Sequence, residues 1–269
     1  MLKKLYRSAL PSSLRSKIRF GLRSLPHLLH DLPSDLFGLN KREIPVPGPF
    51  LRARVGLTTS RDEYAATGLR LFQSLDETVR PALGVSPGEA DVFDFGCGCG
   101  RIAAWVQQQW SPRSLSGFDP DRKAVRWCRS SLKGTFVLRP LIPPLPFSEN
   151  QFHLIYAVSV FTHLPGKAQR LWARELVRLL RPAGILAVSN LSSRHTFERP
   201  ELSIAQHTAL AEGGFLHVPG DGRFNSASSF HSFENLAALF APDLEVVSQV
   251  PFGLAGYQDL SIFRKISAL

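Results

Sequence analysis

Residues 94–101 read DFGCGCGR, in which three glycines alternate with two cysteines between an aspartate and an arginine. The stretch ends a short apolar run, DVFDF at 91–95, and opens CGRIAAWVQQQW at 99–110, which has the pattern of a helix. Glycines between a buried strand and a helix let a ligand approach the backbone closely, and the N–H groups of the turn then face that ligand. The stretch therefore predicts a ligand-binding turn.

The kind of ligand is narrowed by what the turn lacks. A P-loop has Lys and then Ser or Thr after its last glycine, whereas Arg101 and an isoleucine follow here. A dinucleotide fingerprint that starts at Gly96 would also end at position 101, where arginine is too large for close packing of the helix. Cys97, Cys99 and Cys128 form no CxxC pair, so we predict no metal site and interpret the two cysteines of the turn as small residues.

Asp119 adds a second element to this turn. It ends the next predicted strand, LSGFD at 115–119, nineteen residues after Gly100. An acid at the tip of such a strand can accept hydrogen bonds from both hydroxyls of a ribose. Asp94, in turn, suits a ligand that carries an ammonium group. A nucleoside with an amino-acid tail has both features, and this description fits S-adenosylmethionine.

The elements around the turn alternate between strand and helix. This alternation predicts a parallel sheet with helices on both faces. The last two strands are separated by a short loop, so we expect them to pair antiparallel. A helix with Ser60 as its N-cap is predicted before the first strand. That helix falls within 58–83. The remaining predicted strands lie at 135–138, 152–158, 184–190, 244–250 and 258–265, and the remaining predicted helices at 121–132, 168–180 and 232–240.

Linked segments of the chain resemble the successive motifs of class I S-adenosylmethionine-dependent methyltransferases, and in particular those of a bacterial small-molecule branch. The resemblance covers about residues 48–265 and implies a Rossmann-like α/β fold. That fold has a seven-stranded, mostly parallel sheet with helices on both faces and an antiparallel last strand. The segments are VFDFGCGCGRIAAWV, GFDPDRKAVRWCR, PPLPFSENQFHLIYAVSVFTHLP, ELVRLLRPAGILAVSN, FLRARVG and GYQDLSIFRK.

The resemblance also implies that S-adenosylmethionine is the cofactor. Asp94 and the glycines would line its methionine end, Asp119 would hold the ribose, and Pro140 and Leu141 would cover the adenine. Many relatives carry an acid in the loop over the adenine, where this chain has RPLIPP. The whole predicted cofactor site consists of Asp94, Gly96, Cys97, Gly98, Gly100, Asp119, Pro120, Pro140, Leu141 and Ser159.

Histidines are the candidate catalytic residues. In methyl transfer from a sulfonium the protein mainly aligns donor and acceptor and excludes water. An oxygen acceptor usually loses a proton, and histidine is a natural base near neutral pH. His163 follows the fourth strand and His231 precedes the helix at 232–240, so we predict these two, with His195 after the fifth strand as a third candidate. Each also has a structural interpretation, as a packing or solvent-facing histidine.

Two regions lie outside the predicted core of the methyltransferase domain, which we place at 48–269. About forty polar, glycine-rich residues at 191–231 predict a lid-like insertion, or else a surface excursion. Residues 1–47 predict a basic, amphipathic helical arm and linker. Their leucine stripe favours contact with an anionic membrane, although it could also pack on the protein itself or belong to a mitochondrial presequence. The stripe consists of Leu10, Leu14, Ile18, Leu22, Leu25 and Leu29.

Charge and composition limit the function further. The net charge of +10 is uneven, with +8 in residues 1–54 and +2 in the rest, and a near-neutral body argues against a nucleic-acid partner. AVSVF also stands where nucleic-acid amino methyltransferases have Asn/Asp-Pro-Pro-aromatic. Three cysteines and no apolar run of about 18 residues predict a cytoplasmic protein without a spanning helix.

The predicted function is O-methylation of a small molecule, a sugar or a lipid-linked intermediate. Two alternatives stay open on the sequence alone. One is a cofactor-binding scaffold of the same fold without turnover, because intact glycines and Asp119 bear on binding and not on catalysis. The other is a nicotinamide-dependent dehydrogenase.

Overall fold

The computed structural model describes residues 44–56, 58–139, 141–198, 202–220 and 226–267. The described residues divide into two compact units, one that ends at Thr67 and one that begins at Gly68. The predicted basic arm lies outside the described residues. No helix among the described residues is long and apolar enough to span a membrane.

The first unit contains α3 (Pro49–Gly56) and the start of α4 (Arg61–Val79), and the boundary between the units falls within α4. The side chain of Ser60 accepts a hydrogen bond from the Glu63 N–H at 3.3 Å. This contact satisfies one of the free N–H groups of the first helical turn, so the predicted N-cap is confirmed.

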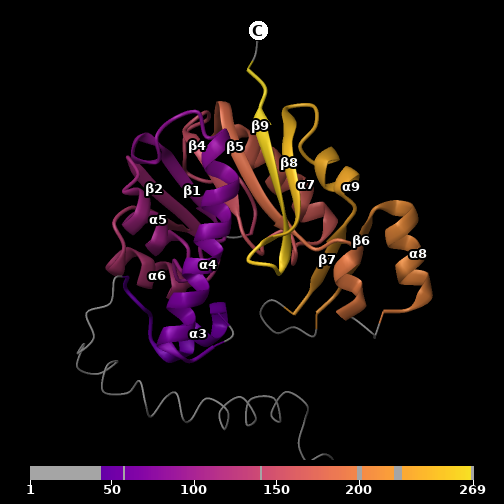
Figure 1. The fold of residues 1–269 in the computed structure, drawn as a ribbon, viewed down its shortest axis with the longest axis horizontal. Coiled ribbons are helices and arrows are strands. Elements are labelled where there is room, and N and C mark those ends of the chain that lie inside the picture. Colours follow the sequence, from indigo (N-terminus) through magenta and orange to yellow (C-terminus); the bar gives the residue numbers. More distant parts are fainter. Residues whose placement is uncertain (1–43, 57, 140, 199–201, 221–225, 268–269) are drawn as a thin grey trace, which may run out of the picture. The chain divides into compact units, whose positions relative to one another are not determined.

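The second unit is built on a seven-stranded sheet (Figure 1) with the strand order β3-β2-β1-β4-β5-β9-β8. Strands β1 to β5 run parallel, and β9 pairs antiparallel with both β5 and β8. The predicted sheet is thus confirmed, with the antiparallel last strand lying one place in from the edge. The strands are β1 (Asp91–Phe95), β2 (Ser114–Asp119), β3 (Thr135–Leu138), β4 (Phe152–Ala157), β5 (Leu180–Asn190), β8 (Leu244–Leu254) and β9 (Gln258–Lys265).

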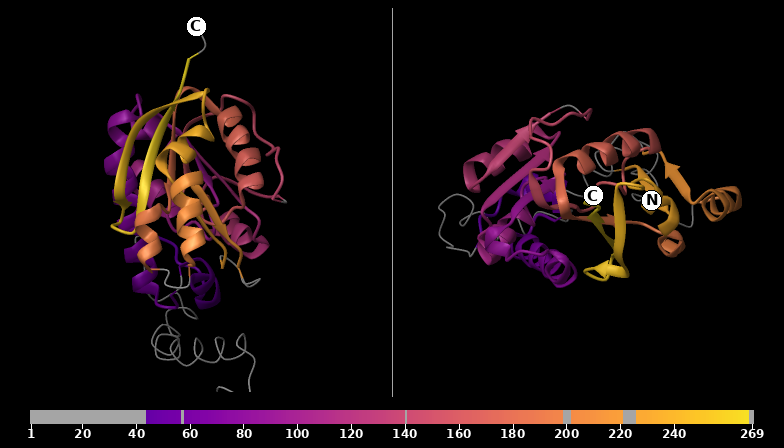
Figure 2. Two further views of the ribbon diagram at one scale, coloured as in Figure 1. Left: turned by 90° about the vertical axis from the view of Figure 1, so that its right-hand side faces the viewer. Right: turned by 90° about the horizontal axis from the view of Figure 1, so that it is seen from above.

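Helices pack on both faces of this sheet, as Figure 2 shows. Trp172 of α7 is fully buried, and its ring lies 4.9 Å from that of Phe95 and 5.2 Å from that of Phe118. Burying side chains of this size stabilises the fold by about 1.5–3 kcal/mol each. This core therefore fixes the ends of β1 and β2, which carry the glycine turn. Besides α4 and the helix of the insertion described below, this unit contains α5 (Ala103–Trp110), α6 (Arg122–Ser131), α7 (Gly166–Leu179) and α9 (Phe233–Ala238).

The insertion predicted at 191–231 contains regular structure of its own. Its strands β6 (Phe215–Val218) and β7 (Ser228–His231) pair antiparallel, and α8 (Ile204–Gly213) precedes them. The buried residues Leu202, Leu210 and Phe230 form a small apolar cluster under these elements. The sequence did not predict this cluster, because the few apolar residues of the insertion are spread over three short elements.

Candidate cofactor and acceptor site

The glycine turn after β1 is fastened to the end of β2. The N–H groups of Gly96 and Cys97 both donate to the carbonyl of Phe118 at 2.9 Å. One residue further on, the Gly98 N–H donates to Oδ2 of Asp119 at 2.8 Å. The two sequence features singled out above, the glycines and Asp119, therefore meet in one hydrogen-bonded structure.

Two of the glycines are required by their surroundings. Gly96 has φ +83°, and a Cβ there would lie 2.3 Å from Cγ2 of Val160. Gly100 has φ +71°, and a Cβ there would lie 2.4 Å from Cδ1 of Leu132. Any side chain would combine a left-handed backbone with a clash. The backbone of the turn can therefore lie close to its neighbours. The turn also extends further than predicted, because α5 begins at Ala103 and not at residue 99.

The cysteines of the turn are packing residues. Cys97, Cys99 and Cys128 are buried, and the Cys128 thiol donates to the Gly98 carbonyl at 3.3 Å. Contact with the Cys128 thiol, together with burial, raises the pKa of Cys97 well above its usual value, so the group stays a neutral thiol. The described part of the chain contains no cluster of three or more His, Cys, Asp or Glu suited to a metal ion.

Asp119 lies at the tip of β2 with only 6% of its surface exposed. Besides the bond from Gly98, its Oδ1 accepts from the Asp121 N–H at 2.8 Å. A carboxylate has about four acceptor positions, so Asp119 can accept hydrogen bonds from several groups at once. The N-cap of α6 is Asp121, whose side chain accepts from the Lys123 N–H at 2.9 Å, and a capping role for Asp119 is therefore not needed.

Asp94 lies at the end of β1 in an unusual electrostatic environment. Burial raises its pKa to about 8, the Tyr156 hydroxyl lowers it, and the negative charge of Asp119 raises it again. Tyr156 faces Asp94 across the β1–β4 register, but its hydroxyl lies outside normal hydrogen-bond geometry. Tyr156 was not predicted from sequence, since only the strand register places it beside Asp94.

The other predicted cofactor residues differ in their surroundings. Ser159 follows β4 with φ +57°, and its N–H donates to Oγ of Ser189 at 2.7 Å. Pro120 is half-buried beside Asp119. Leu141 exposes 55% of its surface, and Pro140 lies outside the described residues.

His163 lies half-buried in the loop after β4, and its Nδ1 is 2.7 Å from the carbonyl oxygen of Ala227. Because a carbonyl can only accept, Nδ1 carries the proton of the neutral ring and Nε2 is its basic nitrogen. The Ser229 N–H also donates to the Thr162 carbonyl at 2.7 Å. These bonds fasten the insertion to the loop that carries His163.

The other two histidines are packed into the structure. His231 of β7 is almost fully buried, and burial lowers its pKa to about 4. In His195, Nδ1 accepts from the Ser192 N–H at 3.0 Å and Nε2 lies 3.1 Å from the Tyr257 carbonyl. Both nitrogens of His195 are thus occupied. Their surroundings favour the structural interpretation for both residues.

Comparisons with known proteins agree with this geometry. Residues 92–184 match the family described as a methyltransferase domain. Methyltransferase GfsG of Streptomyces halstedii is 30% identical over 162 residues, which cover 58% of this chain and 53% of that protein. The phthiotriol/phenolphthiotriol dimycocerosates methyltransferase 1 of Mycobacterium ulcerans is 30% identical over 137 residues, which cover 50% of this chain and 47% of that protein. The chain thus spans about half the length of these curated relatives.

A solved S-adenosylmethionine-dependent methyltransferase from Methanosarcina mazei has the same fold, with a TM-score of 0.55 and 17% identity over 71% of this chain and 98% of that chain. Residues 92–184 are thus a methyltransferase domain, and the fold is that of the class I S-adenosylmethionine-dependent methyltransferases. S-adenosylmethionine is the cofactor of this family. The site fits that group, because Asp94 is buried at the end of β1 and the two groups that shift its pKa, Tyr156 and Asp119, carry no positive charge. A ligand ammonium would supply the positive charge that Asp94 needs to ionise.

Proposed function

We propose that this methyltransferase transfers a methyl group to a hydroxyl of a small molecule, a sugar or a lipid-linked intermediate. The observation that carries the proposal is the tautomer of His163, whose Nδ1 is held by the Ala227 carbonyl. The basic nitrogen is therefore Nε2, in a loop at the carboxyl end of β4. Substrates of doubly wound sheets bind at that end of the strands.

The cofactor supplies an electrophilic methyl group when it is bound. In the proposed site Asp94 ionises and holds the ammonium group, and Asp119 accepts hydrogen bonds from the ribose hydroxyls. The turn at Gly96, Gly98 and Gly100 lets the backbone approach the ligand. These groups bind the cofactor and orient it toward the acceptor, which is the main contribution of a protein to this type of transfer.

The proton of the acceptor hydroxyl then needs a base. In the proposal Nε2 of His163 takes this proton as the new carbon–oxygen bond forms. The Ala227 carbonyl accepts from Nδ1–H throughout, so it keeps the ring oriented and stabilises its positive charge. The insertion, fastened to the same loop through Ser229 and Thr162, would exclude water as a lid.

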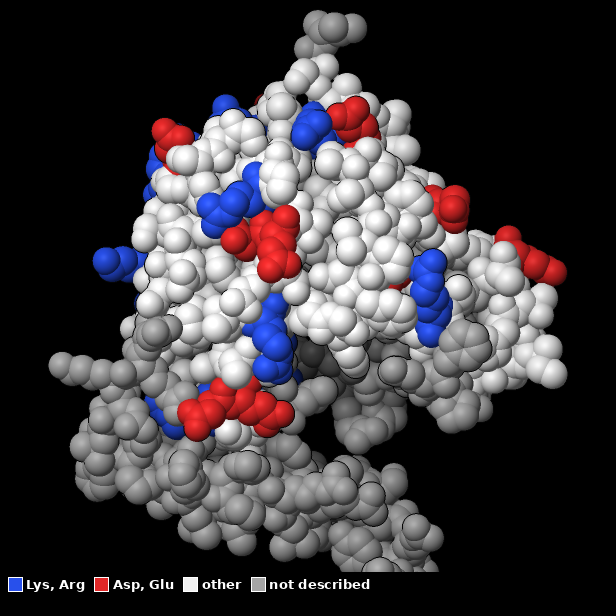
Figure 3. Space-filling view, viewed as in Figure 1, with Lys and Arg blue, Asp and Glu red and all other residues white. Residues whose placement is uncertain are grey.

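The net charge of +2 for residues 55–269 supports a small acceptor over a nucleic acid. On the face drawn in Figure 3, acidic and basic side chains of the described residues alternate and form no extended basic patch. A nucleic-acid enzyme would carry such a patch on its folded body. The name of the relative from Mycobacterium ulcerans refers to triols, which are hydroxyl compounds.

Two measurements test the proposal. S-adenosylhomocysteine at 100 times its Kd should stabilise the fold by about 2.7 kcal/mol, whereas NAD should not. This shift in melting temperature separates the methyltransferase from a dehydrogenase. Incubation with methyl-labelled cofactor and cell extracts should then yield a labelled ether. Binding without labelled product would favour the scaffold, and a labelled ester or amine would contradict the hydroxyl acceptor.

A further inference from the structure

A pair of polar side chains lies fully buried where β5 ends and β9 begins. Asn190 and Asp259 are partners in the antiparallel register of these strands, and neither side chain exposes surface. Directly opposite residues in such a pair have their side chains on the same face, about 5 Å apart. The pair therefore extends the buried face of the sheet at the carboxyl end of β5, on the side where the acceptor is expected.

One atom of each side chain is held by the protein. Oδ1 of Asn190 accepts from the Ser261 hydroxyl at 3.3 Å, and Oδ1 of Asp259 accepts from the Phe252 N–H at 2.9 Å. These bonds fix how both groups are oriented. The remaining atoms, Nδ2 of Asn190 and Oδ2 of Asp259, are buried and make no hydrogen bond within the described residues.

Such an arrangement calls for a hydrogen-bond partner from outside the protein, because leaving a buried polar group unsatisfied is costly. The two atoms are complementary, since an amide nitrogen donates and a carboxylate oxygen accepts. A hydroxyl group donates one hydrogen bond and accepts others, so a single hydroxyl satisfies both atoms at once. Neither an ether, which only accepts, nor an ammonium group, which only donates, can do so.

We propose that Asn190 and Asp259 form a subsite that binds a hydroxyl of the methyl acceptor, which makes the acceptor a sugar or another polyol. This inference rests on the proposed function. One hydroxyl of the polyol is held by the pair while a neighbouring hydroxyl is methylated. Asp259 and Asn190 are thus specificity-determining residues, and the reaction itself proceeds elsewhere on the acceptor.

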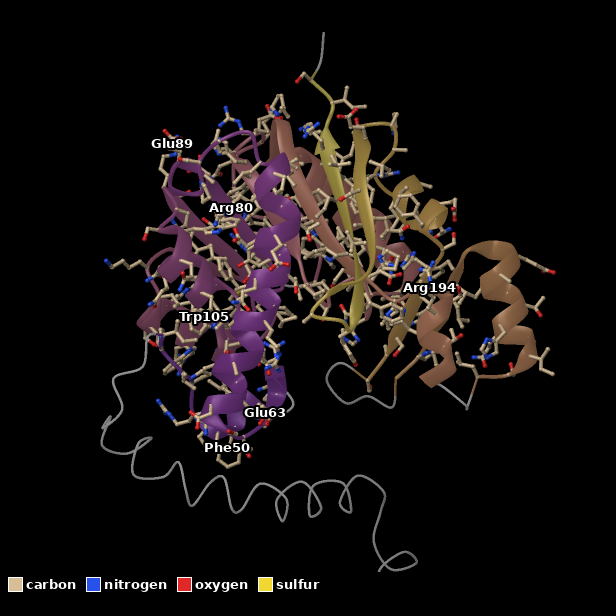
Figure 4. All side chains as sticks on the ribbon, in the orientation of Figure 1. Phe50, Glu63, Arg80, Glu89, Trp105 and Arg194 are labelled. Atoms are coloured by element: carbon tan, nitrogen blue, oxygen red, sulfur yellow. The ribbon has the colours of Figure 1, made fainter. Side chains whose placement is uncertain are left out.

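Arg194 provides the entrance to this subsite. Its Nη1 lies 3.7 Å from Oδ2 of Asp259, at ion-pair distance but too far for a hydrogen bond, and its side chain is 53% exposed. Figure 4 labels this side chain, which belongs to the first residues of the insertion and appears beside the lower part of β8 in that view. A half-exposed arginine can rotate away at little cost, which opens Asp259 to a ligand.

The test observes the side-chain amide of Asn190 by nuclear magnetic resonance in the full-length protein, with Asn190→Asp used to assign the signal. Ethylene glycol should shift this signal in a saturable way. 1,2-Dimethoxyethane, which has the same carbon–oxygen chain but no hydroxyl donor, should not. A site filled by an ordered water only would show no saturable response to the diol, and that result would overturn the proposal.

Matched variants separate recognition from folding. Asp259→Asn keeps an oxygen for the Phe252 N–H but loses the second acceptor, so half-saturation by ethylene glycol should need about tenfold more diol or higher. The double variant Asn190→Asp with Asp259→Asn exchanges donor and acceptor across the pair and should restore binding. Equal binding by wild type and Asp259→Asn would reject the subsite. S-adenosylhomocysteine binding, measured in parallel, reports separately on the proposed function.

Discussion

The buried carboxyl of Asp94 is an acid that the protein holds in its neutral form near pH 7. Its pKa of about 8 is far above the ordinary value of 3.8 because burial disfavours the charge. The folded state therefore binds a proton that the unfolded state has lost, and the free energy of unfolding should fall as pH rises from about 4 to about 8. Chemical denaturation across this range should show a smaller decline in Asp94→Asn than in the wild type. If the free energy of unfolding declined equally in both proteins, Asp94 would not be the group with the raised pKa.

The same residue should couple cofactor binding to proton release. If the ligand ammonium pairs with Asp94, binding near pH 7 should release about one proton as the carboxyl ionises. Calorimetric titration of S-adenosylhomocysteine in buffers of different ionisation enthalpy measures this number. In Asp94→Asn the release should disappear and affinity should drop. An unchanged release in the variant would mean that Asp94 does not meet the ammonium.

His163 can be tested with a pair of variants that separate catalysis from structure. Both His163→Ala and His163→Asn lack a base, so turnover should fall by about 10²–10⁴-fold in each while cofactor affinity is retained. The asparagine, however, can still donate to the Ala227 carbonyl and keep the insertion fastened. If His163→Asn turned over normally and only His163→Ala were impaired, the histidine would serve structure alone. His153, at the opposite end of β4, provides the control substitution.

At the scale of elements, Asp119 and Asp121 divide two tasks between the end of β2 and the start of α6. Asp121→Ala removes a helix cap and should cost about 1 kcal/mol of stability with little change in affinity. Asp119→Ala should instead weaken cofactor binding by about tenfold or more, because bonds to a charged acceptor contribute about 1.5–3 kcal/mol. Urea unfolding measures the stability of both variants, and calorimetric titration measures their cofactor affinity. Unchanged affinity in Asp119→Ala together with weakened affinity in Asp121→Ala would refute this division of roles.

The insertion should be sensitive to acid through His231. Burial lowers the pKa of His231 to about 4 from its ordinary 6.5, so the folded state resists protonation. The stability that His231 contributes is present above pH 6.5 and is lost as pH falls toward about 4. His231→Phe keeps a ring against Phe215 and should lose less stability over that interval. If the free energy of unfolding fell equally with pH in the variant and the wild type, His231 would not be the source of the acid sensitivity.

Local sequence signals predicted the elements of the sheet because each one has its own apolar period. The predicted strands at 135–138 and 258–265 coincide with β3 and β9. The glycine turn follows β1 and contacts Asp119, as the sequence predicted. The pairs that depend on register could not be predicted. Tyr156 beside Asp94, and Asn190 opposite Asp259, are brought together by strands that are distant in sequence.

The roles of the three histidines show the same limit. His163 and His195 follow predicted strands and His231 precedes a predicted helix, so the sequence alone does not rank them. Their differences arise from burial and from partners such as the Ala227 and Tyr257 carbonyls, which lie more than sixty positions away along the chain. Only tertiary packing shows that Nδ1 of His163 faces the Ala227 carbonyl whereas Nε2 of His195 faces the Tyr257 carbonyl.

At the scale of the whole molecule, the basic arm and the near-neutral catalytic body suit a protein that works at an anionic membrane. Residues 1–33 carry seven Lys and Arg, and each contributes about 1 kcal/mol near such a surface. We propose that the arm binds there, which would bring the enzyme to a lipid-linked acceptor. The full-length protein should sediment with anionic liposomes at low salt and less at high salt.

Two matched arm variants show which part of this attraction matters. Replacing Arg15, Arg19 and Arg23 with glutamine keeps the leucine stripe but removes charge, so binding should fall most at low salt. Replacing Leu14, Ile18 and Leu22 with serine keeps the charge but removes the apolar face, so the binding that persists at high salt should disappear. Cofactor affinity should be unchanged in both, because the proposed cofactor residues lie in the second unit. If both variants sedimented like the full-length protein, the arm would have no role at the membrane.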